Sequence, residues 1–340
     1  MHLSRPFPAP TADGSSTGPA AGRRARQAAL ALGLVATVLA VARPAGAAEL
    51  VRAAASTAQA GLTWWKAAIL GIVEGVTEFL PISSTGHLLV TEHILGLDTG
   101  AYAKAADTYA IAIQFGAILA VAGLFWRRFV DMFDGLIGRF PAGRQLLVNL
   151  VVAFLPAAVV GFLFDDTIKA HLFGPWPVVA AWVVGGVLIL VLDAKGLIPS
   201  RGEHTEGRPP VFDITIKQAA IIGLAQCLSL WPGTSRSLVT ILAALLVGVS
   251  MTAAVEFSFL LGFVTLSAAT AFSLLKDGGD LVTTFGVVNP LIGAVFAFVS
   301  AVVAIRWMLT YLEQHSLDIF GWYRIGVSVL TVGLIVGGVV

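Results

Sequence analysis

Charged residues are scarce in this chain. Asp, Glu, Lys and Arg make up 12% of the 340 residues, against about 25% in typical soluble domains. Hydrophobic residues make up 57%, and the mean hydropathy is +0.88. These values exclude an ordinary soluble globular protein. They indicate a polytopic membrane protein with roughly six to nine helical segments of about 20 residues each.

Cysteine and net charge are nearly absent as well. Cys227 is the single cysteine of the sequence, which excludes an internal disulfide and a thiolate metal cluster. Its apolar surroundings favour a small buried side chain without chemistry. The net charge of +1 provides no global field that would attract nucleic acid.

The first 55 residues differ in composition from the rest. Residues 1–27 are rich in Pro, Gly, Ser and Thr, a composition typical of disorder. An apolar run at 28–42 and the sequence AGA at 45–47 follow, and together they resemble a cleavable secretory signal. An uncleaved anchor or an unused upstream start codon would have the same appearance. We expect residues 1–55 to contribute nothing to the core fold.

Two apolar segments are interrupted, and six are not. Residues 63–97 are broken at Pro81, and residues 214–249 are broken at Pro232. Each broken segment is followed by three uninterrupted runs long enough to cross a bilayer as helices. The predicted spans are 107–126, 146–164, 177–192, 255–275, 287–307 and 322–340.

The order of these segments predicts the fold. An odd number of crossings in each half inverts the second half relative to the first. We therefore expect an all-α membrane protein of two inverted repeats, 56–213 and 214–340, each with one re-entrant hairpin and three spans. In such folds the interrupted segments mark the binding site. GIVE at 71–74 also resembles GLAQ at 223–226 in the other half.

Lys and Arg are distributed unevenly among the predicted loops. Residues 127–145 and 193–217 hold eight of them, and the remaining loops hold three, namely Lys104, Lys169 and Lys276. Positively charged loops stay in the cytoplasm, so these two loops are expected inside a bacterial cell membrane. The first hairpin then enters from outside and the second from inside, and the site opens to the outer face.

The first broken segment carries ionisable groups at membrane depth. Residues 74–87 read EGVTEFLPISSTGH. A charge in the bilayer core costs about 2.5 kcal/mol or more, so these groups indicate a functional site; a capped helix end at the membrane surface is the alternative. Glu74 and Glu78 share a helix face. Two close carboxylates need a cation such as Mg²⁺ or Ca²⁺, or a shared proton, and the spacing alone does not choose between them.

Three hydroxyls and an imidazole follow Pro81. Ser83, Ser84 and Thr85 are adjacent, and His87 lies three residues past Ser84, within one helical turn. Ser or His can act as a nucleophile when a base activates it. A lone intramembrane His is often structural, but its place beside two Glu residues favours a functional role.

The second broken segment offers the opposite charge. PGTSRS at 232–237 places Arg236 among Thr234, Ser235 and Ser237. A guanidinium matches phosphate oxygens, and a helix expected to start at Ser237 would add backbone N–H groups to an anion site. Snorkelling of Arg236 to the interface is the alternative. Together the two segments predict a phosphoryl-transfer site within the membrane.

These motifs closely resemble the two signatures of the undecaprenyl-diphosphate phosphatase family, the bacitracin-resistance type. The resemblance runs from about residue 65 to the C-terminus. Leu238 is a departure, because the family usually has Gly there, and it adds bulk beside the phosphate cradle. Further matching stretches are IQFGAILAV at 113–121, FWRR at 125–128, DDTIK at 165–169 and EFSFLL at 256–261.

The resemblance implies hydrolysis of a C55 polyprenyl diphosphate to the monophosphate carrier lipid of cell-wall synthesis, and with it bacitracin resistance. It implies that Glu74 and Glu78 act with a divalent cation, Mg²⁺ or Ca²⁺, and that Arg236 holds the diphosphate. It also implies that Ser84 or His87 stands at the attacking position. The residues expected to bind the substrate phosphates are Ser83, Gln226, Thr234, Ser235, Arg236 and Ser237.

A transporter of the polyprenyl phosphate carrier, a flippase, is the alternative function, because inverted repeats with central hairpins suit alternating access. Phosphate release from a polyprenyl diphosphate distinguishes an enzyme from a transporter. An ion channel is disfavoured, because no span repeats a filter motif. The sequence leaves open whether Ser84, His87 or water attacks, and whether the chain forms a homodimer.

Overall fold

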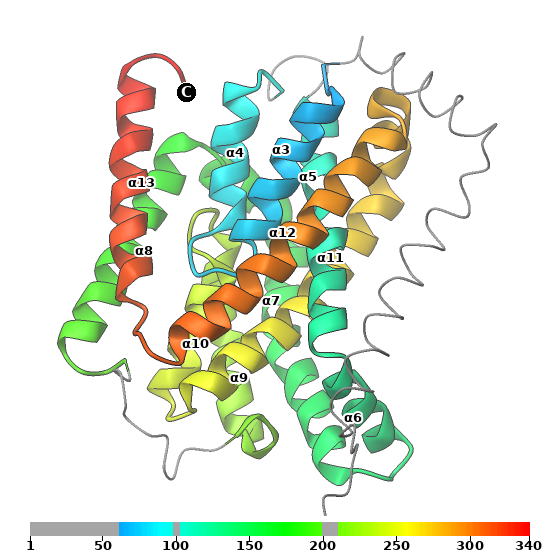
Figure 1. The fold of residues 1–340 in the computed structure, drawn as a ribbon, viewed down its shortest axis with the longest axis vertical. Helices are drawn as coiled ribbons and strands as arrows, with labels where there is room; N and C mark the ends of the chain where they lie inside the picture. Colours follow the sequence, from blue (N-terminus) through cyan, green and yellow to red (C-terminus); the bar gives the residue numbers. More distant parts are fainter. Residues whose placement is uncertain (1–60, 98–102, 199–209) are drawn as a thin grey trace, which may run out of the picture. The chain divides into compact units, whose positions relative to one another are not determined.

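The computed structural model describes residues 61–97, 103–198 and 210–340 (Figure 1). Within these ranges the chain is helical and contains no strand. The signal-like extension expected at 1–55 lies outside the described residues. The all-α fold predicted from the sequence is confirmed for the described part.

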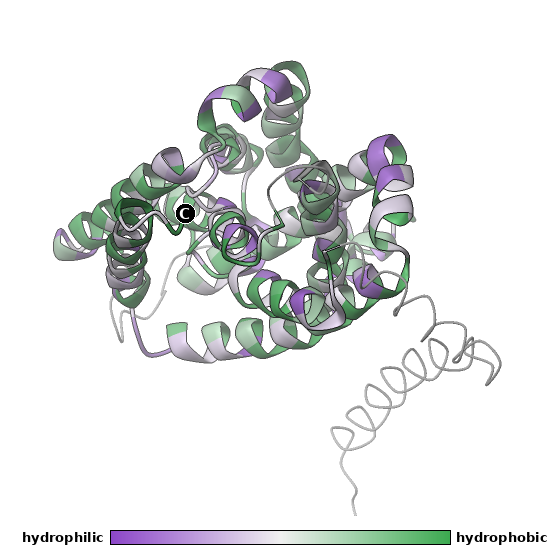
Figure 2. Ribbon diagram, turned by 90° about the horizontal axis from the view of Figure 1, so that it is seen from above, coloured by the Kyte–Doolittle hydropathy of each residue, from purple (hydrophilic) through white to green (hydrophobic). Residues whose placement is uncertain are grey.

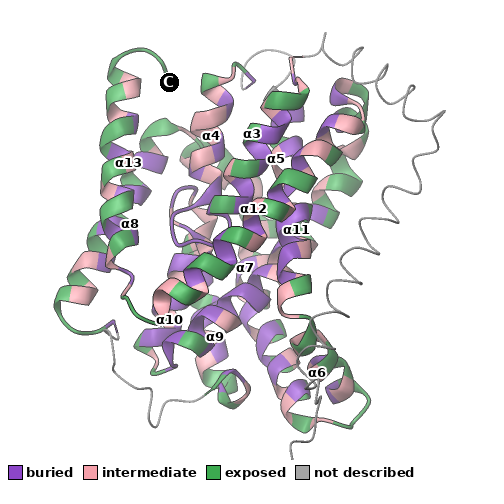
Figure 3. Ribbon diagram, viewed as in Figure 1, coloured by how far each residue is buried: buried purple, intermediate pink, exposed green. Residues whose placement is uncertain are grey.

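Six helices in the described ranges are long and apolar enough to span a bilayer, the number that the sequence predicts. These helices are α5 (Ala103–Leu124), α7 (Pro141–Leu172), α8 (Pro175–Ala194), α11 (Met251–Phe285), α12 (Val288–Leu312) and α13 (Asp318–Val336). Many exposed residues of these helices are large and apolar, as expected where lipid surrounds a protein. Figures 2 and 3 colour the ribbon by hydropathy and by burial.

Two spans are longer than predicted. Helix α7 has 32 residues and α11 has 35, because polar stretches expected to be loops continue both helices. Helix α7 begins at Pro141, which suits the first turn of a helix because its missing N–H would have no partner there. No proline interrupts the stretch from 165 until Pro175, which follows Gly174 after the end of α7. Helix α11 ends at Gly286, which takes the positive φ of 70° that glycine adopts at little cost.

Both interrupted segments form pairs of short helices. The first hairpin consists of α3 (Trp64–Thr77) and α4 (Ser84–Ile94), and the second of α9 (Ile216–Gln226), the 3₁₀ turn η4 (Cys227–Leu230) and α10 (Arg236–Leu246). Helix α3 was expected to end at Pro81 but ends at Thr77, because Pro81 has no N–H to bond the carbonyl four residues earlier, which is that of Thr77. Helix α10 begins at Arg236, one residue before the expected Ser237.

The remaining helices of the described part are short. Helix α6 (Trp126–Leu136) connects α5 to α7, and the 3₁₀ turn η3 (Val211–Asp213) precedes α9. Arg128 of α6 donates hydrogen bonds to Glu256 of α11 and to Asp131. The hydrogen bond with Glu256 raises the pKa of Arg128. Arg128 therefore stays positively charged, and the ion pair between α6 and α11 persists at physiological pH.

The first arm of each hairpin packs against the middle span of the other half. A Cβ on Gly71 or Gly75 of α3 would lie 2.2 Å from a backbone oxygen of α12, and a Cβ on Gly223 of α9 would lie 2.5 Å from the Ala153 oxygen of α7. Glycine therefore permits both close approaches. Helix α5 packs on α11, and α8 lies beside α13 (Figure 1). This reciprocal packing fits inverted repeats, whose detailed topology stays a prediction.

Candidate active site

The tips of the two hairpins meet through an ion pair. Arg236 Nη2 donates to Glu78 Oε1 at 3.0 Å, and the side chains of these residues are 9% and 6% exposed. Arg236 Nη1 donates to the carbonyl of Ser258 on α11 at 3.1 Å. The structure therefore brings together the acidic cluster and the guanidinium that the sequence placed on separate segments.

Glu78 also binds both neighbouring hydroxyls. Ser84 Oγ, at the start of α4, donates to Glu78 Oε2, and Ser237 Oγ donates to the backbone carbonyl of Glu78 at 3.2 Å. A serine hydroxyl that donates to a carboxylate can give up its proton as it attacks. The base in contact with Ser84 is thus Glu78, a residue that the sequence suggested as a metal ligand.

His87 has partners of its own. Its Nδ1 lies 2.7 Å from the Ser83 carbonyl, and its Nε2 lies 2.9 Å from the hydroxyl of Tyr323 on α13. A carbonyl only accepts, so Nδ1 carries the proton and Nε2 of the neutral ring accepts from Tyr323. The ring also packs edge-on against Trp182, with 5.0 Å between centroids. The hydrogen bonds of Ser84 and His87 go to different partners.

Glu74 is a buried carboxylate without a donor. It lies on α3 with no exposed surface, and within the described residues neither of its oxygens has a hydrogen-bond partner. The Glu78 carboxyl is close enough to share a proton with it, and the negative charge of Glu78 repels that of Glu74 while Arg236 attracts it. A buried unpaired carboxylate is costly unless a proton or a cation compensates for it.

The carboxylates of Glu74 and Glu78 fit a divalent cation that substrate phosphate also binds. The described residues contain no cluster of three or more His, Cys, Asp or Glu that could hold a metal by themselves. Mg²⁺, however, is commonly held by one or two carboxylates together with substrate phosphate. The free oxygens of Glu74, beside Glu78, match that smaller requirement.

The start of α10 has the features of an anion site. Ser235 is the N-cap, and its Oγ accepts from the N–H of Leu238 and donates to the Leu80 carbonyl at 3.4 Å. Thr234 donates its N–H to the Trp231 carbonyl. Arg236 Nε has no partner among the described residues, so one guanidinium donor is available to a ligand. The side chain of Leu238 points into the core and is 1% exposed.

Gln226, which is expected to contact the phosphates, lies against α11, and its role in phosphate binding stays a prediction. It is fully buried at the end of α9, and its Oε1 accepts from the hydroxyl of Thr265 on α11 at 3.5 Å. Its Nε2 has no partner within the described ranges. Gln226 therefore occupies in the second hairpin the place that Glu74 has in the first, without a charge.

Arg324 is a residue that the sequence reasoning missed. This fully buried side chain of α13 donates to the carbonyls of Pro81 at 3.3 Å and Gly233 at 2.8 Å, one on each hairpin tip. It also donates to Ala181 and Trp182 of α8. An Arg within an apolar span was the signal, by the same rule that drew attention to Glu74 and Glu78. Tyr323 gave no such signal, because aromatic residues near span ends are common.

Comparisons with known proteins cover nearly all of the described chain. The family described as "Bacitracin resistance protein BacA" matches residues 67–330. The chain is 46% identical to an undecaprenyl-diphosphatase of Sorangium cellulosum over 272 residues, which are 80% of this chain and 86% of that protein. It is 44% identical to undecaprenyl-diphosphatase 2 of Rhodospirillum rubrum, covering 81% and 96%, and 44% identical to undecaprenyl-diphosphatase 1 of Chromobacterium violaceum, covering 78% and 94%.

Proposed function

The chain belongs to the BacA family of bacitracin resistance proteins, and on that premise we propose how its site performs the phosphatase reaction. The protein is an integral membrane hydrolase that converts undecaprenyl diphosphate to the monophosphate and inorganic phosphate. This reaction returns the carrier lipid to cell-wall synthesis. The observation that carries the proposed mechanism is the contact of Glu78 with both Arg236 and Ser84.

Arg236 binds the diphosphate in the proposed mechanism. Its unpaired Nε–H and the N–H groups at the start of α10 offer donors to phosphate oxygens. When substrate binds, the guanidinium exchanges part of its contact with Glu78 for the phosphate. Glu78 is then free to accept a proton. Positive groups that are fixed in place before the reaction stabilise the charge of the transition state.

Ser84 is the proposed nucleophile. Its Oγ forms a bond to the terminal phosphorus while its proton passes to Glu78, and the bond from that phosphorus to the bridging oxygen breaks. The leaving group is the polyprenyl monophosphate. Water then hydrolyses the phosphoserine and releases inorganic phosphate. His87, or water activated at the same place, are the competing attackers, and a phospho-enzyme trapped at Ser84, at His87 or at neither residue distinguishes the three routes.

Glu74 and Glu78 would hold the divalent cation. The unpaired oxygens of Glu74 support this assignment, and the ion, when bound, supplies positive charge that offsets the charge of the phosphates. Mg²⁺ and Ca²⁺ both prefer such oxygen ligands.

The proposed location is the cell membrane of a bacterium, with the site open to the outer face. The support is the excess of Lys and Arg in 127–145 and 193–217. Because Cys227 is the single cysteine, a chain with Cys227→Ala and Arg139→Cys, at an exposed position of the loop 127–145, tests the orientation by labelling with a membrane-impermeant thiol reagent. Labelling of intact cells would contradict the proposed orientation.

The decisive experiment measures phosphate release from undecaprenyl diphosphate by the purified chain in detergent. The unmodified protein releases phosphate, and a chelator abolishes release. Glu78→Gln and Arg236→Ala each lower the rate about a hundredfold or more. Glu313→Gln, at an exposed position after α12, is the matched control and keeps the rate. A flippase without enzymatic activity would release no phosphate in any sample.

A further inference from the structure

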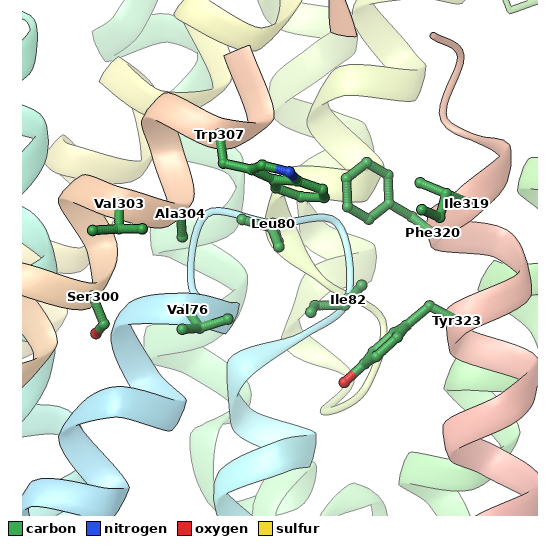
Figure 4. A pocket seen from close by; sticks show the side chains of 10 residues that line it. All are labelled: Val76, Leu80, Ile82, Ser300, Val303, Ala304, Trp307, Ile319, Phe320 and Tyr323. Atoms are coloured by element: carbon green, nitrogen blue, oxygen red, sulfur yellow. The ribbon is translucent and has the colours of Figure 1, made fainter. Parts of the chain in front are cut away.

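An apolar cavity lies beside the hairpin tips. It has a volume of about 570 Å³ and is lined by side chains of α3, the loop after it, α12 and α13, including Val76, Leu80, Ile82, Val303, Trp307 and Phe320. Figure 4 shows Leu80 and Ile82 on the loop between the side chains of α12 and those of α13. This volume is typical of pockets for small ligands. We call the cavity the α12–α13 groove.

The groove opens on the outer surface of two membrane spans. Val303 of α12 is 63% exposed, and Tyr323 of α13 is 44% exposed. The outer surface of a spanning helix faces lipid rather than water. A hydrocarbon chain can therefore enter the groove sideways from the bilayer without crossing water.

The groove adjoins the active site, because two of its lining residues contact residues of the site. Leu80 lines the groove, while its backbone carbonyl accepts the hydroxyl of Ser235 at the start of α10. Tyr323 also lines the groove, and its hydroxyl lies 2.9 Å from Nε2 of His87. The same short loop that follows Glu78 thus forms both the edge of the phosphate site and the wall of the groove.

We propose that the α12–α13 groove binds the isoprene units nearest to the diphosphate of the lipid substrate. This inference rests on the proposed function and adds the place where the tail is held. The volume accommodates a few isoprene units and not a whole C55 chain, so the distal units stay in the bilayer. Holding the proximal units fixes the diphosphate against Arg236 and Ser84, as substrate positioning requires.

Filling the groove from its lipid side tests the proposal. Val303→Trp places an indole at the opening of the groove. Val299→Trp is the matched control: it makes the same change one turn earlier on α12, at a residue that is 54% exposed and does not line the groove. KM and kcat are measured for undecaprenyl and farnesyl diphosphates with the full-length purified protein. Val303→Trp raises KM about tenfold for both substrates, since the loss of two buried CH₂ groups has this effect, and leaves kcat nearly unchanged. Val299→Trp behaves like the unmodified chain.

Photolabelling of the unmodified protein is a second test, which needs no substitution. A polyprenyl diphosphate with a photoreactive diazirine on its first isoprene unit labels peptides that contain Val303 or Phe320 of the unmodified protein. Equal KM values for the two tryptophan variants, or labelling confined to other helices, would show that the tail binds elsewhere. A protein that releases phosphate from neither diphosphate before any substitution would instead overturn the proposed function and the groove assignment with it.

Discussion

The two hairpins share a backbone plan and differ in charge. In each, a serine with an unusual positive φ precedes the second helix, Ser83 at 74° and Ser235 at 73°. The first hairpin supplies carboxylates, and the second supplies the guanidinium of Arg236. Neither charge is tolerable alone at membrane depth, but together they offset each other's loss of hydration. Similar backbones thus position opposite charges, and the chemistry comes from the difference in side chains.

Removing Arg324 is the most severe way to separate the two hairpins. Arg324→Met leaves the carbonyls of Pro81 and Gly233 without their donor, at about 1–3 kcal/mol for each group. The thermal unfolding midpoint in detergent falls, and amide exchange rises at both tips. Arg306→Met, at an exposed position of α12, is the control and changes neither quantity. Faster exchange at only one tip would show that Arg324 does not link the hairpins.

Replacing Glu74 by the amide found at the corresponding position of the second hairpin tests whether the difference in charge between the hairpins matters. Glu74→Gln gives the first hairpin the residue that Gln226 supplies in the second. Phosphate release falls about a hundredfold, equivalent to about 2.7 kcal/mol in the barrier, and Mn²⁺ binding measured by electron paramagnetic resonance weakens. Folding stability does not fall, because an unpaired buried carboxylate is removed.

The reciprocal change tests whether the position alone matters. Glu74→Gln combined with Gln226→Glu does not restore activity, because the proposed cation lies beside Glu78, which Glu74 adjoins, whereas Gln226 contacts Thr265 of α11. Full Mn²⁺ binding and activity in the Glu74→Gln chain would contradict the proposed role of Glu74.

A smaller disturbance displaces the guanidinium of Arg236 in the second hairpin without removing its charge. A Cβ on Gly262 of α11 would lie 2.1 Å from Arg236 Nη1, so Gly262→Ala shifts the guanidinium and lowers kcat/KM about tenfold. Gly279→Ala on the same helix meets nothing within 4 Å, and it keeps activity while gaining up to about 1 kcal/mol of helix propensity. Equal activity of the two variants would mean that Arg236 tolerates displacement.

The mildest test compares the two serines of positive φ. Ser83→Gly relieves backbone strain and raises stability by about 1 kcal/mol, since the Ser83 side chain makes no capping bond in the described structure. Ser235→Gly gains the same relief but loses the bonds of Oγ with Leu80 and Leu238, worth about 1 kcal/mol, so its melting temperature stays near that of the unmodified protein. Identical shifts would show that the two serines have equivalent roles.

The sequence predicted the features that follow from local composition. Apolar length alone located six spans, and Pro81 and Pro232 located both breaks. The rule that intramembrane charges are costly identified Glu78 and Arg236, which the structure brings within 3.0 Å of each other. The C-terminal continuations of α7 and α11 were missed, because a polar stretch without proline can be helix or loop.

The features that depend on distant contacts could not be predicted. Tyr323 meets His87 across 236 positions of sequence, and the pattern contains no trace of that contact. The positive φ of Ser83 and Ser235 carries no signal either, since glycine is the residue that usually marks such a conformation. Whether Ser84 would donate to Glu78 or to His87 depends on where α3 ends, and the predicted end at Pro81 was four residues too late.

The position of Arg324 has a consequence for biogenesis. Chains enter the membrane from the N-terminus onwards, and α13 is the last helix of the described fold. The carbonyls of Pro81 and Gly233 therefore wait for their common donor until every other helix is in place. Insertion of α13 is thus the step that joins the two hairpin tips through one shared donor.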